Sequence, residues 1–185
     1  MKTLLPVTLL IFTLSTALGQ GNTPATRTVP AKVEIPREHL AFLVGTFTTE
    51  MHILPGRIIK TESVGKGITT ISWTLDSMFL FIDEKSQNSA LGSYKAMGFL
   101  GFDPREQQYV LSMYNNFGDE PVYRGTFSGD TLVLAAKIPG RGKPFDQQVR
   151  WYTAGGDLHL DALNDTGEGY LRVMREVLTP AREGK

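Results

Sequence analysis

The sequence predicts an all-β protein, a single antiparallel meander β-barrel of about ten strands preceded by a short helix. Three observations support this fold class. After residue 45 the apolar residues change from the roughly 3.6-residue repeat of a helix to the two-residue repeat of a strand. Runs rich in aromatic and β-branched residues then follow at short intervals. The connections between these runs are too short for a crossover helix, so successive strands must pair antiparallel.

Residues 1–19 have the pattern of a secretory signal peptide. Lys2 provides a positive start, and residues 4–14 are almost wholly apolar. Ala17-Leu18-Gly19 places small side chains before an expected cut at Gln20. The apolar run is shorter than the roughly twenty residues that cross a bilayer, so we expect no membrane span, with a retained anchor as the alternative. We therefore predict an exported protein, either periplasmic or secreted.

The composition excludes several classes of site. The chain has no cysteine, which excludes disulfides, thiolate metal sites and a lipid-modified cysteine. It has 19 Lys and Arg against 19 Asp and Glu, and loss of Lys2 with the leader leaves 18 against 19. A near-neutral surface offers no basic patch for phosphate backbones, so we expect no nucleic-acid partner. The sequence leaves the oligomeric state open.

The rest of the chain divides into a tether, one domain and a tail. Residues 20–34 are rich in Thr, Pro and Ala, which is typical of a flexible tether. We predict the barrel domain over residues 35–180 and a C-terminal tail over residues 181–185. That length suits one domain with a sizeable core, and the absence of an internal repeat argues against solenoids and propellers.

The domain is expected to begin with a short helix and a regular strand. Pro36 precedes a helical pattern over residues 37–43, and Gly45 ends it. Residues 46–53 then alternate apolar and polar side chains, and a Leu-Pro-Gly turn at residues 54–56 ends this strand. The helix is expected to close one end of the sheet.

Nine further strands follow, joined by short turns. Gly65-Lys66-Gly67 is interpreted as a bulge or turn inside one long, bent strand. Ser128-Gly129-Asp130 and Ala154-Gly155-Gly156 are tight hairpin signals. The predicted strand runs are residues 58–64 with 68–73, then 77–83, 94–102, 108–115, 122–128, 131–138, 148–153, 157–163 and 170–178.

We expect the sheet to close because an open sheet would leave unpaired edge strands. An open sheet of ten strands would leave two unpaired edges and one face of aromatic side chains without a covering layer. A closed barrel removes the edges and creates an interior. We therefore predict a barrel, with a two-sheet sandwich as the alternative.

Several stretches of the domain carry a family resemblance. LVGTFTTE at residues 43–50 places Phe47 at the aromatic position of the Gly-x-Trp motif of lipocalin-like barrels. GTFTTEMHILPG, SWTLDSMFLF, GSYKAMGFLGFD, YVLSMYNNFG, GTFSGDTL and MREVLTP extend the likeness from about Leu40 to Pro180. Together they resemble an uncharacterised bacterial family of lipocalin-like (calycin-type) secreted domains of unknown function. The resemblance implies a ten-stranded barrel and supplies no ligand or catalytic residue. Phe47 departs from the usual Trp, but either ring can close a barrel end.

Two clusters contain residue types that bind metals. His52 shares a strand face with Glu50, and His159 shares one with Asp157 and Asp161. We interpret both clusters as polar side chains on a solvated outer wall and expect no metal and no cofactor. A haem site would need a histidine directed inward among apolar neighbours. The chain also lacks a Gly-x-Ser-x-Gly elbow and a phosphate-binding loop, so no catalytic residue is predicted.

Aromatic side chains are more numerous in the strands than the sealing of a barrel requires. We predict that some of them line a cavity that binds a small, largely apolar molecule. Alternatively, the rings simply fill the barrel. An arginine that enters the cavity could meet an acidic ligand group, although arginines more often extend outward. The predicted ligand-binding residues are Trp73, Phe81, Phe99, Tyr114, Trp151 and Arg150.

Two other functions remain open. One is an enzyme that uses an acid or a histidine in the barrel cavity for general acid–base chemistry. The other is a structural or partner-binding envelope protein with a filled barrel, whose loops at residues 87–92 or 140–145 make the contacts. Whether the protein is an enzyme is therefore left open at this point.

Overall fold

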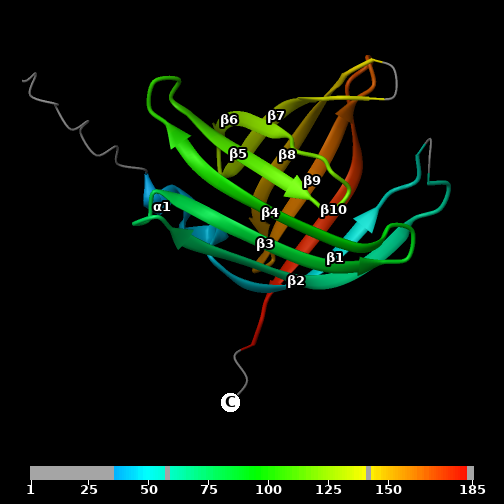
Figure 1. Ribbon diagram of the computed structural model, residues 1–185, viewed down its shortest axis with the longest axis horizontal. Helices are drawn as coiled ribbons and strands as arrows, with labels where there is room; N and C mark the ends of the chain where they lie inside the picture. Colours follow the sequence, from blue (N-terminus) through cyan, green and yellow to red (C-terminus); the bar gives the residue numbers. More distant parts are fainter. Residues whose placement is uncertain (1–35, 57–58, 141–142, 183–185) are drawn as a thin grey trace, which may run out of the picture. The chain divides into compact units, whose positions relative to one another are not determined.

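The barrel predicted from the sequence is present. A computed structural model describes residues 36–56, 59–140 and 143–182. Ten strands form one closed antiparallel barrel in the order β1-β10-β9-β8-β7-β6-β5-β4-β3-β2 (Figure 1). This confirms the meander barrel and excludes the two-sheet alternative. The predicted signal peptide and tether lie outside the described residues.

The element bounds agree with most of the predicted runs. The helical segment is one α-helical turn followed by one 3₁₀ turn. The elements are α1 (Arg37–Leu40), η1 (Ala41–Leu43), β1 (Gly45–Ile53), β2 (Ser63–Thr74), β3 (Phe79–Asn88), β4 (Gly92–Asp103), β5 (Gln108–Asn115), β6 (Val122–Ser128), β7 (Thr131–Ile138), β8 (Phe145–Ala154), β9 (Asp157–Asp165) and β10 (Tyr170–Pro180).

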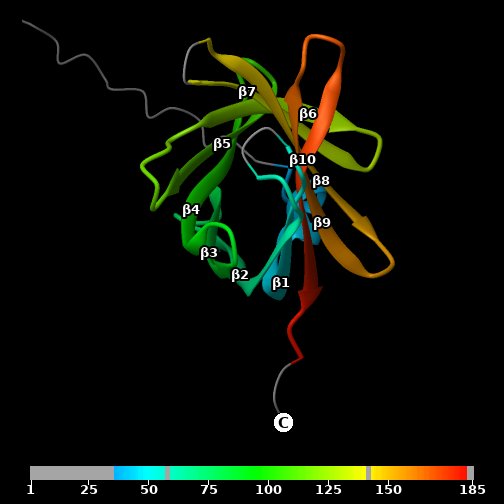
Figure 2. The same cartoon turned by 90° about the vertical axis from the view of Figure 1, so that its right-hand side faces the viewer.

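The first and last strands close the ring. β1 pairs with β2 on one side and with β10 on the other, and Figure 2 shows these strands side by side. The helical segment lies at the end of the barrel where β1 begins (Figure 1). It buries Leu40 and Leu43 in the core, and Phe42 contacts the Phe127 ring. One end of the barrel is therefore filled by apolar side chains. None of the described helices is long and apolar enough to cross a membrane.

The predicted bulge in β2 is wrong. The pairing of β2 with both neighbours runs without a register shift through Gly65 and Gly67. Gly67 serves a different purpose, because a Cβ atom there would overlap the Lys85 carbonyl oxygen and the Ser86 side chain. The glycine lets β2 and β3 approach closely. The strand also begins at Ser63, later than the predicted start.

Strand β3 is longer than predicted. The sequence pattern ended it at residue 83, where the apolar alternation stops, but pairing with β2 and β4 continues to Asn88. The continuation is polar on both faces, with Glu84, Ser86 and Asn88 buried on the inner one. The barrel interior therefore changes from apolar to polar along this strand.

Candidate functional site

The inner surface of the barrel has an apolar half and a polar half. The apolar half adjoins α1 and η1 and includes Leu80, Leu100, Leu132 and Trp151. Strand alternation directs these side chains inward, because every second residue faces the same side of a sheet. Towards the other end the inward positions carry polar groups. The buried polar side chains of the inner face are Thr49, Ser63, Thr69, Glu84, Ser86, Asn88 and Glu176.

Two carboxyl groups are buried inside the barrel. Glu84 is 5% exposed and Glu176 is 3% exposed. Their strands, β3 and β10, are separated in the ring by β1 and β2. On the inner face of β2, Thr69 pairs with Glu84, and the next two inward positions carry Gly67 and Gly65, which have no side chain. The two acids form the centre of the candidate site.

Burial changes the protonation of this acid pair. Removal from water disfavours a carboxylate, which raises the pKa of Glu84 to about 7. The Ser86 hydroxyl opposes this shift in pKa, although its oxygen makes no hydrogen bond of ordinary geometry. Burial and the charge of Glu84 raise the pKa of Glu176 well above its ordinary value. Among the described residues, no buried side chain is a lysine, arginine or histidine, so the pair lacks a buried countercharge.

Tyrosines and amides continue the polar half. Burial, followed by the charges of Glu84 and Glu176, raises the pKa of the Tyr94 phenol, which keeps it neutral. Burial also raises the pKa of Tyr123 to about 12. The Tyr123 hydroxyl donates to Gln147 Oε1 at 2.6 Å, and Gln147 Nε2 donates to Asn164 Oδ1 at 2.8 Å. Tyr123, Gln147 and Asn164 are thus linked by hydrogen bonds in the polar half of the barrel, which also contains the acid pair.

Within the described ranges, three buried polar side-chain atoms on the inner face have no hydrogen-bond partner. They are Glu84 Oε1, Ser86 Oγ and the indole Nε1 of Trp151. Buried polar groups are nearly always paired, so each unpaired group has a cost of about 1–3 kcal/mol. They face the same interior, with Trp151 in the apolar half and Glu84 and Ser86 in the polar half, which suits a ligand that has both an apolar body and polar groups.

The residues predicted to bind a ligand do not share one face. Trp151 is buried inside the barrel, and Trp73 is half-buried near the helical end with the Arg37 guanidinium 6.0 Å from its ring centre. Phe99 and Tyr114 are 36% and 46% exposed on the outer wall. Phe81 lies against Phe99 there, with ring centres 5.2 Å apart. A ligand inside the barrel would not contact these three rings.

Alternation explains this placement. Leu80 and Ile82 occupy the inner face of β3, so Phe81 between them faces out. Arg150 is also directed outward, where its Nη2 donates to Gln148 Oε1 at 3.0 Å. The binding role of all six predicted residues stays a prediction, and only the two tryptophans lie on the inner face.

The two histidine clusters lie on the outer wall, as expected. His52 contacts Glu62 at 2.6 Å and Glu50 at 2.8 Å, and these two hydrogen bonds raise its pKa. His159 stacks on Tyr152 with ring centres 5.2 Å apart. Within the described residues, no group of three or more His, Asp or Glu side chains is arranged to hold a metal ion.

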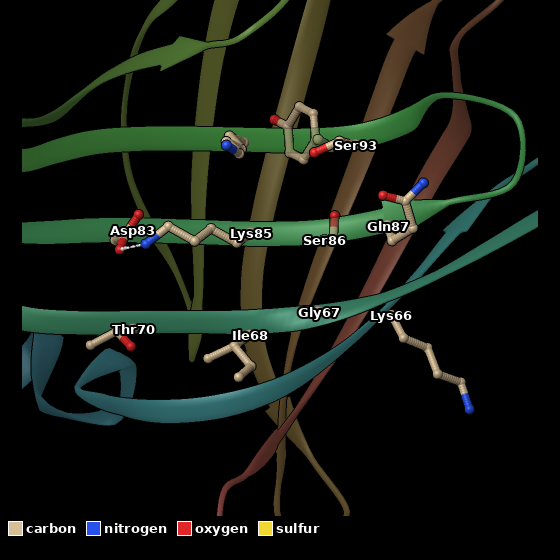
Figure 3. Close-up of a pocket in the computed structure, with 11 residues that line it drawn as sticks. Lys66, Gly67, Ile68, Thr70, Asp83, Lys85, Ser86, Gln87 and Ser93 are labelled. Carbon is tan, nitrogen blue, oxygen red and sulfur yellow. Dashed lines mark hydrogen bonds and ion pairs between the residues drawn. The ribbon is translucent and has the colours of Figure 1, made fainter.

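A groove of about 470 Å³ crosses the outer wall over β2, β3 and β4 (Figure 3). Lys66, Lys85 and Lys95 are among its lining residues, and Lys85 Nζ pairs with Asp83 Oδ2 at 2.7 Å. These side chains alternate along the strands with the inward ones, so they lie on the opposite side of the sheet from Glu84. The outer groove is therefore separate from the acid pair.

The sequence reasoning missed both acids. A signal for Glu84 was present, because Leu80, Ile82 and Glu84 occupy alternate positions and an acid therefore continues an apolar face. Glu176 likewise alternates with Met174 and Leu178. An ionisable group on an apolar strand face is a sign of a functional interior.

The chain forms a closed ten-stranded antiparallel barrel with a helical segment at one end. Residues 32–153 match the family described as Protein of unknown function (DUF1579), and the chain belongs to that family. Glu84 lies within the matched range, whereas Glu176 lies beyond it. No curated protein matches the sequence. The barrel is similar to the S-type phycobiliprotein lyase CPES from Guillardia theta, with a TM-score of 0.56 and 10% identity over 80% of this chain and 93% of that one.

Proposed function

We propose that the barrel binds a small, largely apolar molecule that carries a cationic nitrogen, with Glu84 and Glu176 as the recognising groups. The observation that carries this proposal is the burial of two carboxyl groups with no buried Lys, Arg or His side chain in the described part of the chain. Ionised carboxylates in such a site are costly unless they are paired. A ligand ammonium would supply the missing charge and would favour the ionised acids.

The apolar half of the interior supports the proposal that most of the ligand is apolar. Trp151 and the leucines beside it offer an apolar surface for the body of the ligand, and the indole Nε1 offers a free donor. Apolar walls with a few placed polar groups are the usual chemistry of small-molecule sites. The similar barrel belongs to a phycobiliprotein lyase, which supports a small-molecule role by analogy of fold alone.

Calorimetric titration at pH 8 with octylamine, octanol and sodium octanoate tests the proposal. These probes share one alkyl chain and differ in the charge of the head group. We expect octylamine to bind most tightly and octanoate most weakly, because the acid pair attracts a cation and repels an anion. Glu176→Gln should weaken octylamine about tenfold or more and change octanol binding little.

A matched control is Glu106→Gln, which removes an exposed carboxylate from the turn between β4 and β5. It should leave all three affinities unchanged. Equal affinities for the three probes, or an equal loss of octylamine binding in both variants, would show that the acid pair does not recognise a cation.

A second function, acid–base catalysis, is favoured by one observation. A carboxyl group with a pKa of about 7 can both donate and accept a proton near neutral pH, and Glu84 meets that condition. The neutral Tyr94 phenol can donate a hydrogen bond to a bound molecule, and its raised pKa leaves the proton transfer to Glu84. Chemical analysis of a bound molecule after incubation separates the two functions, because a carrier returns it unchanged.

We also propose that the protein acts after export from the cytoplasm. The positive start, the apolar run at residues 4–14 and the small residues before Gln20 support this place of action. Intact-mass measurement of the protein from its own host should give a chain that begins at Gln20. A mass that includes Met1 or residues 2–19 would contradict the proposal.

A further inference from the structure

A second groove, of about 820 Å³, crosses the outer wall over β6 to β10. It is hollow because the outward positions of β7 carry the short side chains Thr131, Val133 and Ala135. Longer side chains on the flanking strands form its sides. The groove is lined by Arg124, Gly125, Thr126, Ser128, Thr131, Val133, Ala135, Gln148, Arg150, Tyr152, Asp161 and Arg172.

Strand pairing brings the arginines of this groove together. Ala135 of β7 pairs with Arg124 of β6 on one side and with Gln148 of β8 on the other. Arg124 and the outward residues of β8 therefore face each other across β7. Val133 of β7 pairs with Arg150, which pairs with Asp161 of β9. The short side chains of β7 therefore lie between guanidinium groups on both sides.

The groove carries more positive than negative charge. Its single carboxylate, Asp161, is 4% exposed and is bound by Arg172 Nη2 at 3.0 Å and by Arg175 Nε at 3.3 Å. Arg124 Nη1 is 3.9 Å from Asp103 Oδ2, at the limit of an ion pair. Among the described residues, Arg150 has no carboxylate oxygen within 4.0 Å, and its hydrogen bond to Gln148 leaves its charge uncompensated.

Two guanidinium groups also keep unused donors. The Nε atoms of Arg150 and Arg172 are buried without an acceptor. Their planar forks match the oxygens of a phosphate, and the same groove is also lined by the hydroxyl residues Thr126, Ser128 and Thr131. Three arginines against one aspartate leave two positive charges, which suits a dianion.

We propose that this outer groove binds the phosphate group of a small phosphorylated molecule. Arg150 and Arg124 contact the phosphate from opposite sides, and Asp161 positions Arg172 beside them. The groove is larger than a bare phosphate, so the body of the ligand lies along Val133 and Ala135. The phosphate can belong to a soluble monoester or to a lipid head group, since the recognising chemistry is the same.

Titration of ¹⁵N-labelled protein, observed at the arginine Nε–Hε resonances, tests this site. The probes are glycerol 3-phosphate, glycerol, and vesicles of phosphatidylcholine with or without phosphatidic acid. We expect saturable shifts of the Arg150 and Arg172 resonances with glycerol 3-phosphate and none with glycerol. Arg150→Gln should weaken binding about tenfold or more, and Arg124→Gln should act in the same direction.

The charge-matched control is Arg105→Gln in the exposed β4–β5 turn, which should leave the affinity unchanged. Glu84→Gln should also leave the affinity for glycerol 3-phosphate unchanged, because that carboxyl group lies inside the barrel. The proposal for the outer groove is therefore tested independently of the proposal for the interior. Binding to phosphatidic acid vesicles alone would assign the phosphate to a lipid. Unsaturable shifts, or equal weakening by Arg105→Gln and Arg150→Gln, would overturn the proposal.

Discussion

The double variant Glu84→Gln/Glu176→Gln is expected to be more stable than the unmodified protein at pH 8 and about equally stable at pH 4. Both acids have raised pKa values in the folded state, so the folded protein binds more protons than the unfolded chain above pH 4.5. The contribution of each acid to the free energy of unfolding is therefore fully present below its pKa in the unfolded chain. It is lost as the pH rises through the pKa of the same acid in the folded protein. For Glu84, a change in pKa from 4.5 to about 7 corresponds to about 3 kcal/mol, and Glu176 acts in the same direction.

Urea unfolding at pH 4, 6 and 8 measures this difference. His52 also has a raised pKa, and its stabilising contribution falls with rising pH. Because both proteins contain His52, that contribution cancels in the comparison. The Glu106→Gln variant should follow the unmodified protein at every pH. If the free energy of unfolding of the double variant fell in parallel with that of the unmodified protein between pH 4 and pH 8, Glu84 and Glu176 would not be the cause of the pH dependence.

Gly67→Ala is expected to reduce the free energy of unfolding by about 3 kcal/mol or more. The added Cβ would meet the Lys85 carbonyl oxygen and the Ser86 backbone, which cannot rotate away as a flexible side chain can. Strands β2 and β3 would have to separate at the level of the acid pair. Thermal and urea unfolding of the variant give the loss of stability.

The control for this substitution is Gly56→Ala. No atom of the described residues other than its chain neighbours lies within 4 Å of a Cβ built at Gly56, so the same chemical change should alter stability by less than about 0.5 kcal/mol. A similar, small effect of both substitutions would mean that β2 and β3 can separate at Gly67 without cost.

The turn residues and the alternation of apolar and polar residues in the sequence predict the barrel well. The hairpin turns at residues 129–130 and 155–156 contain Gly129, Gly155 and Gly156 with positive φ angles of 59°, 64° and 92°, a conformation that glycine adopts without strain. Such signals act over a few residues, so they can be read from the chain directly. Closure follows from strand number and edge pairing, which also require no knowledge of side-chain contacts.

The interior site is harder to predict because it depends on which face of each strand turns inward. Both faces of β3 and β4 carry apolar side chains, so the sequence gives no reason to direct Phe81 outward and Ile82 inward. Glu84 and Glu176 are far apart in the chain and become neighbours only when the ring closes. Their proximity is a property of strand order rather than of any local motif.

The position of Glu176 on β10 has a consequence for the order of folding. Each of the other strand pairs in the barrel joins neighbours along the chain, whereas β1 and β10 meet across almost the whole domain. That contact carries the largest loop-closure entropy, so it forms late, after the hairpins are in place. Until then both carboxyl groups remain hydrated, and above about pH 4.5 they are ionised. Between the unfolded and the folded pKa values, the final step of barrel assembly is therefore also a proton-uptake step, in which the chain takes protons from the surrounding water as its last strand docks.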